Sequence, residues 1–158
     1  MRVCFGDDEL AGRVAVGSGA IADDQPRRHP GFSRQHHHGR CIIVAISALR
    51  VKKKIGADAR PGAVFKCRRP TGEVIRVDAP GRDPIVTRIL WLEGTEPRNR
   101  RAFARCIYIH GTPEERNIGY PASYGCIRMR SADIIELFNT VGIGARVFIT
   151  PKPLPHRP

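Results

Sequence analysis

A histidine and a cysteine are the residues of this chain whose types and spacing most directly point to chemistry. His110 ends the segment CIYIH, and Cys126 follows sixteen positions later in the segment YGCIRM. A thiol becomes a strong nucleophile when a neighbour lowers its pKa or takes its proton, and imidazole is the usual partner. Gly125 lets the backbone approach closely, and Arg128 supplies positive charge nearby. The spacing alone leaves two interpretations: a thiol enzyme, or a buried structural thiol near an unrelated histidine.

The elements on either side would hold this pair in place. Cys106 to His110 predicts a strand, and the glycines and prolines of residues 111–125 predict a loop that can fold back toward it. A helix is predicted over Ser131 to Thr140, with Ser131 as its N-cap and Gly142 at its end. Because Cys126 lies shortly before this helix, we expect the helix N-terminus to lower the thiol pKa.

The rest of the chain is predicted to be rich in strands and turns. Sixteen glycines and thirteen prolines argue against a helical bundle. Residues 1–40 read as an irregular segment with a short candidate strand at Val14 to Val16, and Arg50 to Lys54 read as a basic stretch. Further strands are predicted at Cys41–Leu49, Gly62–Cys67, Glu73–Val77, Pro84–Leu92 and Arg146–Thr150.

Charge and composition narrow the class of partner. The chain has 158 residues, enough for one domain with a core, and a formal net charge of +12. A basic surface favours an anionic partner such as nucleic acid, an acidic membrane face or an anionic cell-wall polymer, although a solvated surface without a specific partner is equally compatible. The basic residues have few aromatic residues between them, which argues against a specific nucleic-acid platform.

Five cysteines and a run of histidines raise the question of metal binding. No two cysteines have C-x-x-C spacing, so a structural zinc site is not expected, and Cys67 and Cys106 read as small core residues. His36 to His38, followed by Cys41, could bind a metal. However, three adjacent histidines do not share a face of a helix or strand, so a solvated loop is the preferred interpretation. No metal or other cofactor is predicted.

Membrane and export signals are not evident in the sequence. No run of 18 apolar residues predicts a transmembrane helix. The N-terminal segment has Asp7, Asp8 and Glu9 where the apolar region of a secretory signal would lie, so it is not predicted to be one.

The segments IHGT, IGYPASYGCIRM, DIIELF and VGIGARVFIT together resemble the catalytic region of the L,D-transpeptidases of the YkuD family. The earlier segments KKKIGADARPGAVFKCRRPTGEVI and DPIVTRILWLEG resemble the same family, so the resemblance covers roughly residues 50–150. It implies a mainly β fold, a YkuD-like β-sandwich with one or two short helices. The implied organisation is an uncertain segment at 1–40, a catalytic domain at 41–151 and a Pro-rich tail at 152–158.

The resemblance also implies a mechanism. Cys126 would attack the carbonyl of the diamino acid in a peptidoglycan tetrapeptide stem, releasing D-alanine and leaving a thioester that an amine of a second stem resolves. His110 would act as base and then acid, with the Gly111 carbonyl orienting its ring. Arg128 would support the thiolate or a substrate carboxylate. Ser123 and the backbone amides of Tyr124, Gly125 and Cys126 would line the oxyanion pocket.

Two departures from the family pattern stand out. Tyr124 occupies a position where the family usually has histidine, and we expect it to form the rim of the site. Residues 1–48 lack the strand pair, the Thr-Pro-x-Gly turn and the export signal of the family, which leads to the hypothesis of a truncated or frame-shifted start. The chemistry implies the periplasm or cell wall as its location. The alternatives are an L,D-carboxypeptidase or other hydrolase of the same stems, and an inactive basic relative that binds the wall or nucleic acid.

Overall fold

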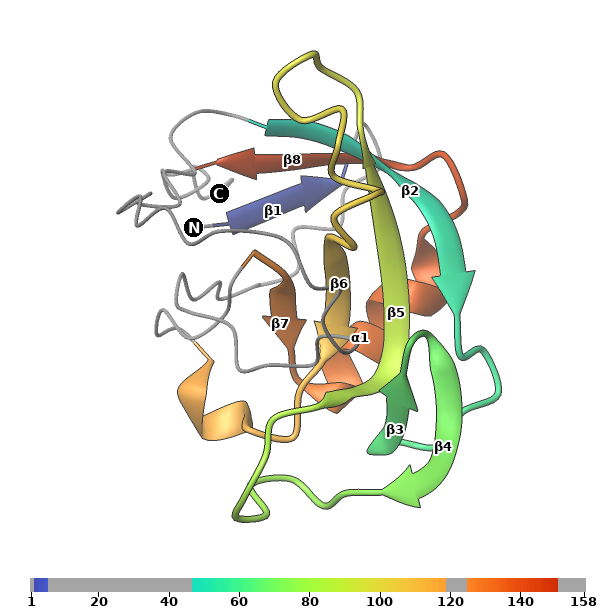
Figure 1. The fold of residues 1–158 in the computed structure, drawn as a ribbon, viewed down its shortest axis with the longest axis vertical. Helices are drawn as coiled ribbons and strands as arrows, with labels where there is room; N and C mark the ends of the chain where they lie inside the picture. The colour runs from blue at the N-terminus through green and yellow to red at the C-terminus, as the bar shows by residue number, and fades with distance from the viewer. Residues whose placement is uncertain (1, 6–46, 119–124, 151–158) are drawn as a thin grey trace, which may run out of the picture.

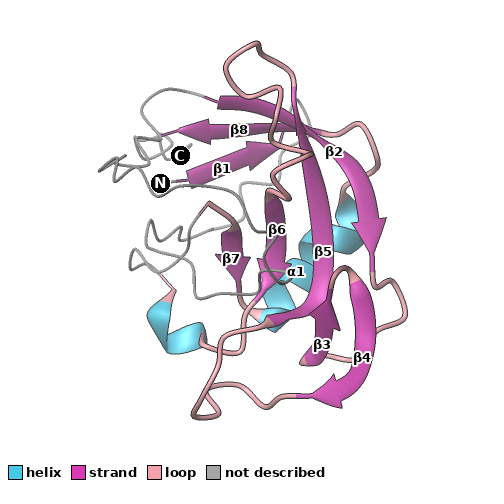
Figure 2. Ribbon diagram, in the orientation of Figure 1, coloured by secondary structure: helices cyan, strands magenta, loops and turns pink. Residues whose placement is uncertain are grey.

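The structure is a computed structural model that describes residues 2–5, 47–118 and 125–150. Strands dominate these residues, with one α-helix and one short 3₁₀ helix (Figure 2). In chain order the elements are β1 (Arg2–Phe5), β2 (Ser47–Ile55), β3 (Ala63–Lys66), β4 (Arg69–Val74), β5 (Ile85–Gly94), β6 (Tyr108–Gly111), η1 (Glu115–Asn117), β7 (Ile127–Met129), α1 (Ser131–Thr140) and β8 (Arg146–Thr150).

All eight described strands belong to one hydrogen-bonded sheet. Its main path runs in the order β1-β8-β2-β5-β3-β4, and β6 pairs with both β5 and β7. The β6–β7 pair is parallel, and the other pairs are antiparallel. The long strands β2 and β5 curve strongly across the molecule, and α1 crosses behind β5 and β6 (Figure 1).

The main apolar core lies between this sheet and α1. Ile134, Leu137 and Phe138 of the helix are buried against side chains from β2, β5, β6, β7 and β8. The buried strand residues are Leu49, Val51, Leu90, Leu92, Ile109, Ile127, Met129, Val147 and Ile149. The core is therefore aliphatic apart from Phe138, as the low aromatic content of the chain requires.

The prediction of a mainly β fold with one or two short helices is confirmed, with the strands joined in a single curved sheet. The strands predicted near residues 62–67, 84–92, 106–110 and 146–150 are present as β3, β5, β6 and β8, with shifted ends. The strand predicted at 73–77 overlaps β4 only at Glu73 and Val74. The basic stretch Arg50 to Lys54 was not predicted as a strand, yet it forms most of β2. Its apolar member Val51 points into the core while Lys52 and Lys53 face solvent.

Two other strands had no sequence prediction. β7 is only three residues long, and its alternation of Ile127, Arg128 and Met129 is too short to be distinguished from a loop. β1 lies within the segment predicted to be irregular and pairs with β8. The candidate strand at 14–16 and most of the one at 41–49 lie outside the described residues.

Helix α1 has the predicted bounds but a different N-terminus. Arg130 is its N-cap and makes no side-chain capping bond, so the assignment of Ser131 as N-cap was wrong. The Ser131 hydroxyl instead lies 2.8 Å from Thr87 Oγ1, and Thr87 Oγ1 also accepts a 2.9 Å hydrogen bond from the Gly62 amide. Thr87 has a φ of 72° at a register irregularity of β5, a conformation that side-chain bonds of this kind help to hold.

Lys54 on β2 caps the other end of α1. Its ammonium donates to the carbonyl oxygens of Phe138 and Val141, the latter at 2.7 Å, and lies 4.4 Å from the centre of the Phe138 ring. A cation at a helix C-terminus satisfies carbonyl groups that have no partner within the helix and complements the helix dipole. Lys54 thereby fixes α1 to the sheet. No described helix is long and apolar enough to cross a membrane.

We expect Lys54→Met to lower the free energy of unfolding by about 1–2 kcal/mol, because two carbonyls lose a charged donor while the apolar stem is kept. Urea unfolding monitored by circular dichroism measures this. Lys53→Met is the matched control, since Lys53 is exposed on the same strand, and we expect it to change stability by less than about 0.5 kcal/mol. Equal effects of the two substitutions would contradict the capping role.

Candidate active site

The parallel pairing of β6 and β7 places the predicted pair on one face of the sheet. Ile109 pairs with Ile127, and both point into the core beneath α1. Side chains alternate along a strand, so His110 and Arg128, which pair directly, point to the opposite face. Cys126, one residue before β7, packs on that same face with Tyr108 of β6. The nucleophile and base candidates thus share a surface although sixteen positions separate them in the sequence.

His110 is buried and held by its own neighbour. Its Nδ1 lies 2.8 Å from the carbonyl oxygen of Gly111. A carbonyl can only accept, so Nδ1 donates the proton and Nε2 keeps a free lone pair. Burial lowers the pKa of His110 below its usual value, while the Gly111 carbonyl and the charge of Asp83 act in the opposite direction. At neutral pH the ring is therefore uncharged and suited to accept a proton at Nε2.

Gly111 is a site of close backbone approach. A Cβ at this position would lie 2.6 Å from the Val86 carbonyl oxygen of β5 and 3.3 Å from Ile134 of α1. Strand and helix therefore close over the glycine on its core side. This packing fixes the carbonyl that holds the His110 ring.

Cys126 is half-buried, and its environment keeps the thiol protonated. Its Sγ donates to the Cys106 carbonyl oxygen at 3.5 Å, and burial raises its pKa to about 11. This is opposite to the lowered pKa that the sequence led us to expect from the helix N-terminus. The physical reason is burial: Cys126 packs in the cluster of Tyr108, Ile89 and Phe65, where little water is left to stabilise a thiolate.

The N-terminus of α1 is occupied by a different group. The Ser131 amide donates a 2.8 Å hydrogen bond to the carboxylate of Glu115, which lies on η1. A carboxylate is the group that the positive end of a helix favours. The helix therefore anchors the loop that leads to the site and does not activate the thiol.

Arg128 is buried, with 5% of its side chain exposed, and lies between carboxylates. Its Nη1 forms an ion pair with Asp83 and lies 3.9 Å from Glu114. Asp83 also accepts a hydrogen bond from Thr112, so residues from both sides of the site join in one network. Nη2 of Arg128 is buried and has no hydrogen-bond partner within the described residues. An oxygen of a bound ligand would satisfy it.

The three remaining candidates lie around the loop before β7. Gly125 has a φ of 140°, which is strained for any residue with a Cβ, so glycine is required there. Ser123 and Tyr124 lie outside the described residues. The oxyanion-pocket hypothesis therefore stays a prediction for both of them.

Sequence reasoning missed the residues that surround the pair. Asp83, Glu114 and Glu115 carried no motif, and only their position in polar loops marked them. Cys67 was predicted to be a core residue but is exposed in the turn between β3 and β4, while Cys106 is half-buried beside Cys126. His36 to His38 lie outside the described residues, and those described contain no group of three or more His, Cys, Asp or Glu suited to a metal.

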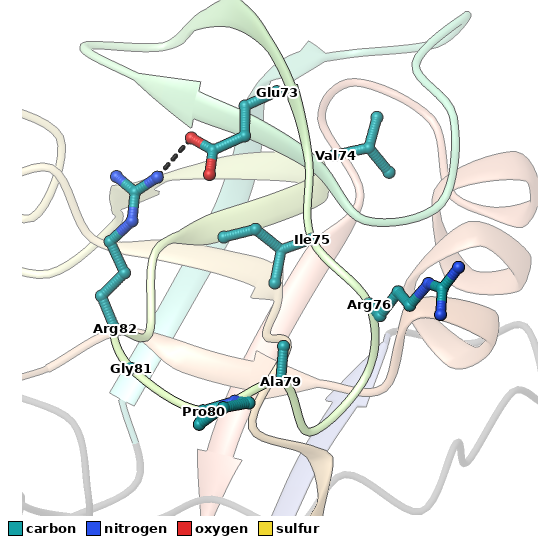
Figure 3. A pocket seen from close by; sticks show the side chains of 8 residues that line it. All are labelled: Glu73, Val74, Ile75, Arg76, Ala79, Pro80, Gly81 and Arg82. Carbon is teal, nitrogen blue, oxygen red and sulfur yellow. Dashed lines mark hydrogen bonds and ion pairs between the residues drawn. The ribbon is translucent and has the colours of Figure 1, made fainter.

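A cavity of about 570 Å³ lies beside β4 (Figure 3). Residues 73–76 and 79–82 line it, and an ion pair joins Arg82 to Glu73. Neither His110 nor Cys126 contributes to this lining. The cavity is therefore separate from the candidate active site.

Comparison with known proteins agrees with the geometry. The family model described as the L,D-transpeptidase catalytic domain, YkuD, matches residues 3–149, so this chain belongs to that family. The match starts well before residue 50, so the resemblance noted in the sequence was too narrow. It also includes strand β1. No solved structure matches the chain.

Similarity to individual curated proteins is confined to short segments. The chain is 48% identical over 42 residues to the putative L,D-transpeptidase YqjB of Bacillus subtilis, covering 27% of this chain and 24% of that protein. It is 51% identical over 43 residues to the putative L,D-transpeptidase YkuD of Bacillus licheniformis, covering 27% and 26%. It is 46% identical over 50 residues to the probable L,D-transpeptidase ErfK/SrfK of Escherichia coli, covering 32% and 16%. The matched segments thus span about a quarter or less of these relatives.

We expect Gly111→Ala to destabilise the protein by about 2–4 kcal/mol, because the new methyl group meets backbone that cannot move aside without disturbing β5. It should also displace the carbonyl that holds His110. Chemical unfolding and the NMR shift of the His110 ring measure the two effects. Gly142→Ala is the control, since nothing lies within 4 Å of its Cβ position. A Gly111→Ala protein as stable as the control would contradict the close packing.

The pKa of Cys126 predicts slow alkylation at neutral pH. We expect the rate of its reaction with iodoacetamide to rise with pH toward a midpoint near 11, since only the thiolate reacts. Peptide mass mapping follows this residue separately from the exposed Cys67, which should react faster at pH 7 because solvent reaches it. A midpoint for Cys126 at or below about 8.5, the ordinary thiol value, would contradict the effect of burial.

Proposed function

We propose that this chain is a cysteine L,D-transpeptidase domain that cross-links peptidoglycan stems through a Cys126 thioester. One observation carries the proposal most strongly. Nδ1 of His110 donates its proton to the Gly111 carbonyl, so Nε2 keeps a lone pair that can accept a proton. His110 lies on the same sheet face as Cys126. The family membership supplies the substrate class, peptidoglycan, on which the periplasm or cell wall as location also rests.

The protonation states support a concerted transfer of the proton. With a pKa of about 11, Cys126 is thiolate in only about one molecule in ten thousand at pH 7. His110 is neutral there because burial lowers its pKa. His110 therefore takes the thiol proton as Sγ attacks the carbonyl carbon of the stem diamino acid. The Gly111 carbonyl and the Asp83 charge both raise the pKa of His110, so they offset part of the cost that burial and the Arg128 charge impose on the resulting imidazolium.

The acylation step then releases the terminal residue. The Sγ–C bond forms, the C–N bond to D-alanine breaks, and the imidazolium gives its proton to the departing amine. An amine of a second stem next attacks the thioester carbonyl and loses a proton to His110. The C–S bond breaks, and the thiol recovers that proton. Backbone amides at Gly125 and Cys126, with Ser123 and Tyr124, are proposed to stabilise the oxyanion of each tetrahedral intermediate.

Arg128 is proposed to bind the donor rather than the thiolate. Asp83 and Glu114 already compensate its charge, while the buried Nη2 offers an unused donor to a substrate oxygen. Water in place of the acceptor amine would make the same site an L,D-carboxypeptidase. The thioester chemistry is common to both reactions, so the hydrolase is the second candidate.

An adduct experiment tests the nucleophile. We expect the wild-type protein incubated with a disaccharide-tetrapeptide to gain the mass of the donor minus D-alanine, and with a carbapenem the mass of the whole drug. Intact-mass spectrometry should show neither adduct on Cys126→Ala, because no thioester can form. His110→Gln should acylate about 100-fold or more slowly, since general-base catalysis is lost.

Cys67→Ala is the control for this experiment, because it removes an exposed thiol outside the site. It should form both adducts at the wild-type rate. A wild-type protein without an adduct, or an adduct that persists on Cys126→Ala, would overturn the proposed nucleophile. Release of free tetrapeptide minus D-alanine, with no cross-linked product in the presence of acceptor stems, would favour the hydrolase.

A further inference from the structure

We propose that Arg68 is a specificity residue that binds the carboxylate of the leaving amino acid in the peptide donor. This inference rests on the proposed function, in which a peptide ending in a free carboxylate is cleaved at Cys126. Arg68 belongs to none of the motifs that mark the site in the sequence. It reaches the site from the turn between β3 and β4.

The turn aims Arg68 at the candidate active site. Lys66 pairs with Arg69, so Cys67 and Arg68 form a two-residue turn with φ values of 49° and 67°. Two positive φ values match the twist of a hairpin, but they are disfavoured for residues that carry a Cβ. Neither residue is the glycine or asparagine that such turns prefer. The Arg68 side chain that leaves this strained turn contacts Trp91, Tyr108 and Cys106.

Those contacts fix the guanidinium without neutralising it. Its Cζ lies 4.6 Å from the centre of the Trp91 ring, and Nη1 lies 3.2 Å from Tyr108 Oη and 3.4 Å from Cys106 Sγ. The hydrogen bond to the Tyr108 hydroxyl raises the pKa of Arg68, so the group is charged. None of the three partners is a carboxylate, and Arg68 forms no ion pair with any described residue.

Arg68 and Cys126 approach the same short segment. The Cys106 sulfur accepts a hydrogen bond from Arg68, and the Cys106 carbonyl oxygen accepts the 3.5 Å hydrogen bond from the Cys126 thiol. Cys126, Cys106 and Trp91 all pack on one cluster with Tyr108. In a peptide donor, only the amide nitrogen and one Cα separate the scissile carbonyl from the carboxylate of a terminal leaving residue. That carboxylate therefore lies near Cys126, on the surface where Arg68 supplies a cation.

The guanidinium has donors left for such a ligand. Nη1 is the donor in every hydrogen bond that Arg68 makes to the described residues, so Nη2 and Nε can donate to a bound carboxylate. A guanidinium fork matches the two oxygens of a carboxylate, and stacking on Trp91 holds its plane. A terminal amide lacks the negative charge and would bind less tightly.

A binding experiment with a non-acylating protein tests this assignment. In the Cys126→Ala background, calorimetry compares a tetrapeptide stem ending in a free D-alanine carboxylate with the same peptide ending in an amide. We expect the acid to bind about tenfold tighter or more, because it forms charge-assisted hydrogen bonds. Adding Arg68→Met should remove this preference, and Arg68→Lys should keep part of it. Arg69→Met is the matched control and should keep it fully, since Arg69 is the exposed next residue.

The outcomes separate the two proposals. Equal affinity for acid and amide, including no binding of either, overturns the role of Arg68, as does a preference that survives in Arg68→Met. Thermal unfolding of each variant and the partial preference of Arg68→Lys distinguish a lost contact from a disrupted turn. A protein that prefers the acid but forms no acyl adduct in the wild-type form would instead refute the proposed acyl transfer. Acylation without acid preference would refute only this inference.

Discussion

The parallel pairing of β6 with β7 is the constraint on which the site depends. Each strand has one face closed by α1 through Ile109, Ile127 and Met129, so the other face must carry the polar and reactive side chains. A parallel neighbour needs a crossover connection of a dozen residues or more, and residues 112–126 provide it. A shift of the register by one position would turn the side chain of His110 or Arg128 into the core. The apolar packing therefore determines which side chains face the candidate site.

Burial shifts the pKa values of Cys126 and His110 in opposite directions. Removal from water disfavours the charged form of each group, so it raises the pKa of Cys126 and lowers that of His110. Both members of the pair are neutral at pH 7, and an ion pair need not form before substrate arrives. The Gly111 carbonyl and the Asp83 charge favour a protonated His110. In the proposed mechanism they take the place of the carboxylate that holds the histidine in a Ser-His-Asp triad.

A network of charges holds the loops against this sheet face. Asp83 links Arg128 to Thr112, and Glu115 links η1 to the start of α1. The strained β3–β4 turn holds Arg68 over the Trp91 ring and within hydrogen-bond distance of the Tyr108 hydroxyl. Arg128 is thus compensated by carboxylates, while Arg68 has no carboxylate partner among the residues that the structure describes. This asymmetry is the reason for assigning the donor carboxylate to Arg68.

The sequence by itself determined the mainly β class, the bounds of α1, and the His110 and Cys126 candidates, because helical periodicity and residue spacing are local properties. The Gly111 candidate came from the resemblance to the YkuD family. It placed β3, β5, β6 and β8 approximately. It did not reveal β1, β7 or the strand character of Arg50 to Lys54, because short or basic strands are stabilised by their partners rather than by their own pattern. Only the tertiary structure decided that burial raises the Cys126 pKa, that Glu115 occupies the helix N-terminus, and that Arg68 contacts Cys106, whose carbonyl oxygen accepts a hydrogen bond from the Cys126 thiol. Each of these depends on which segments, distant in the sequence, pack against one another in the fold, and no local pattern reports that packing.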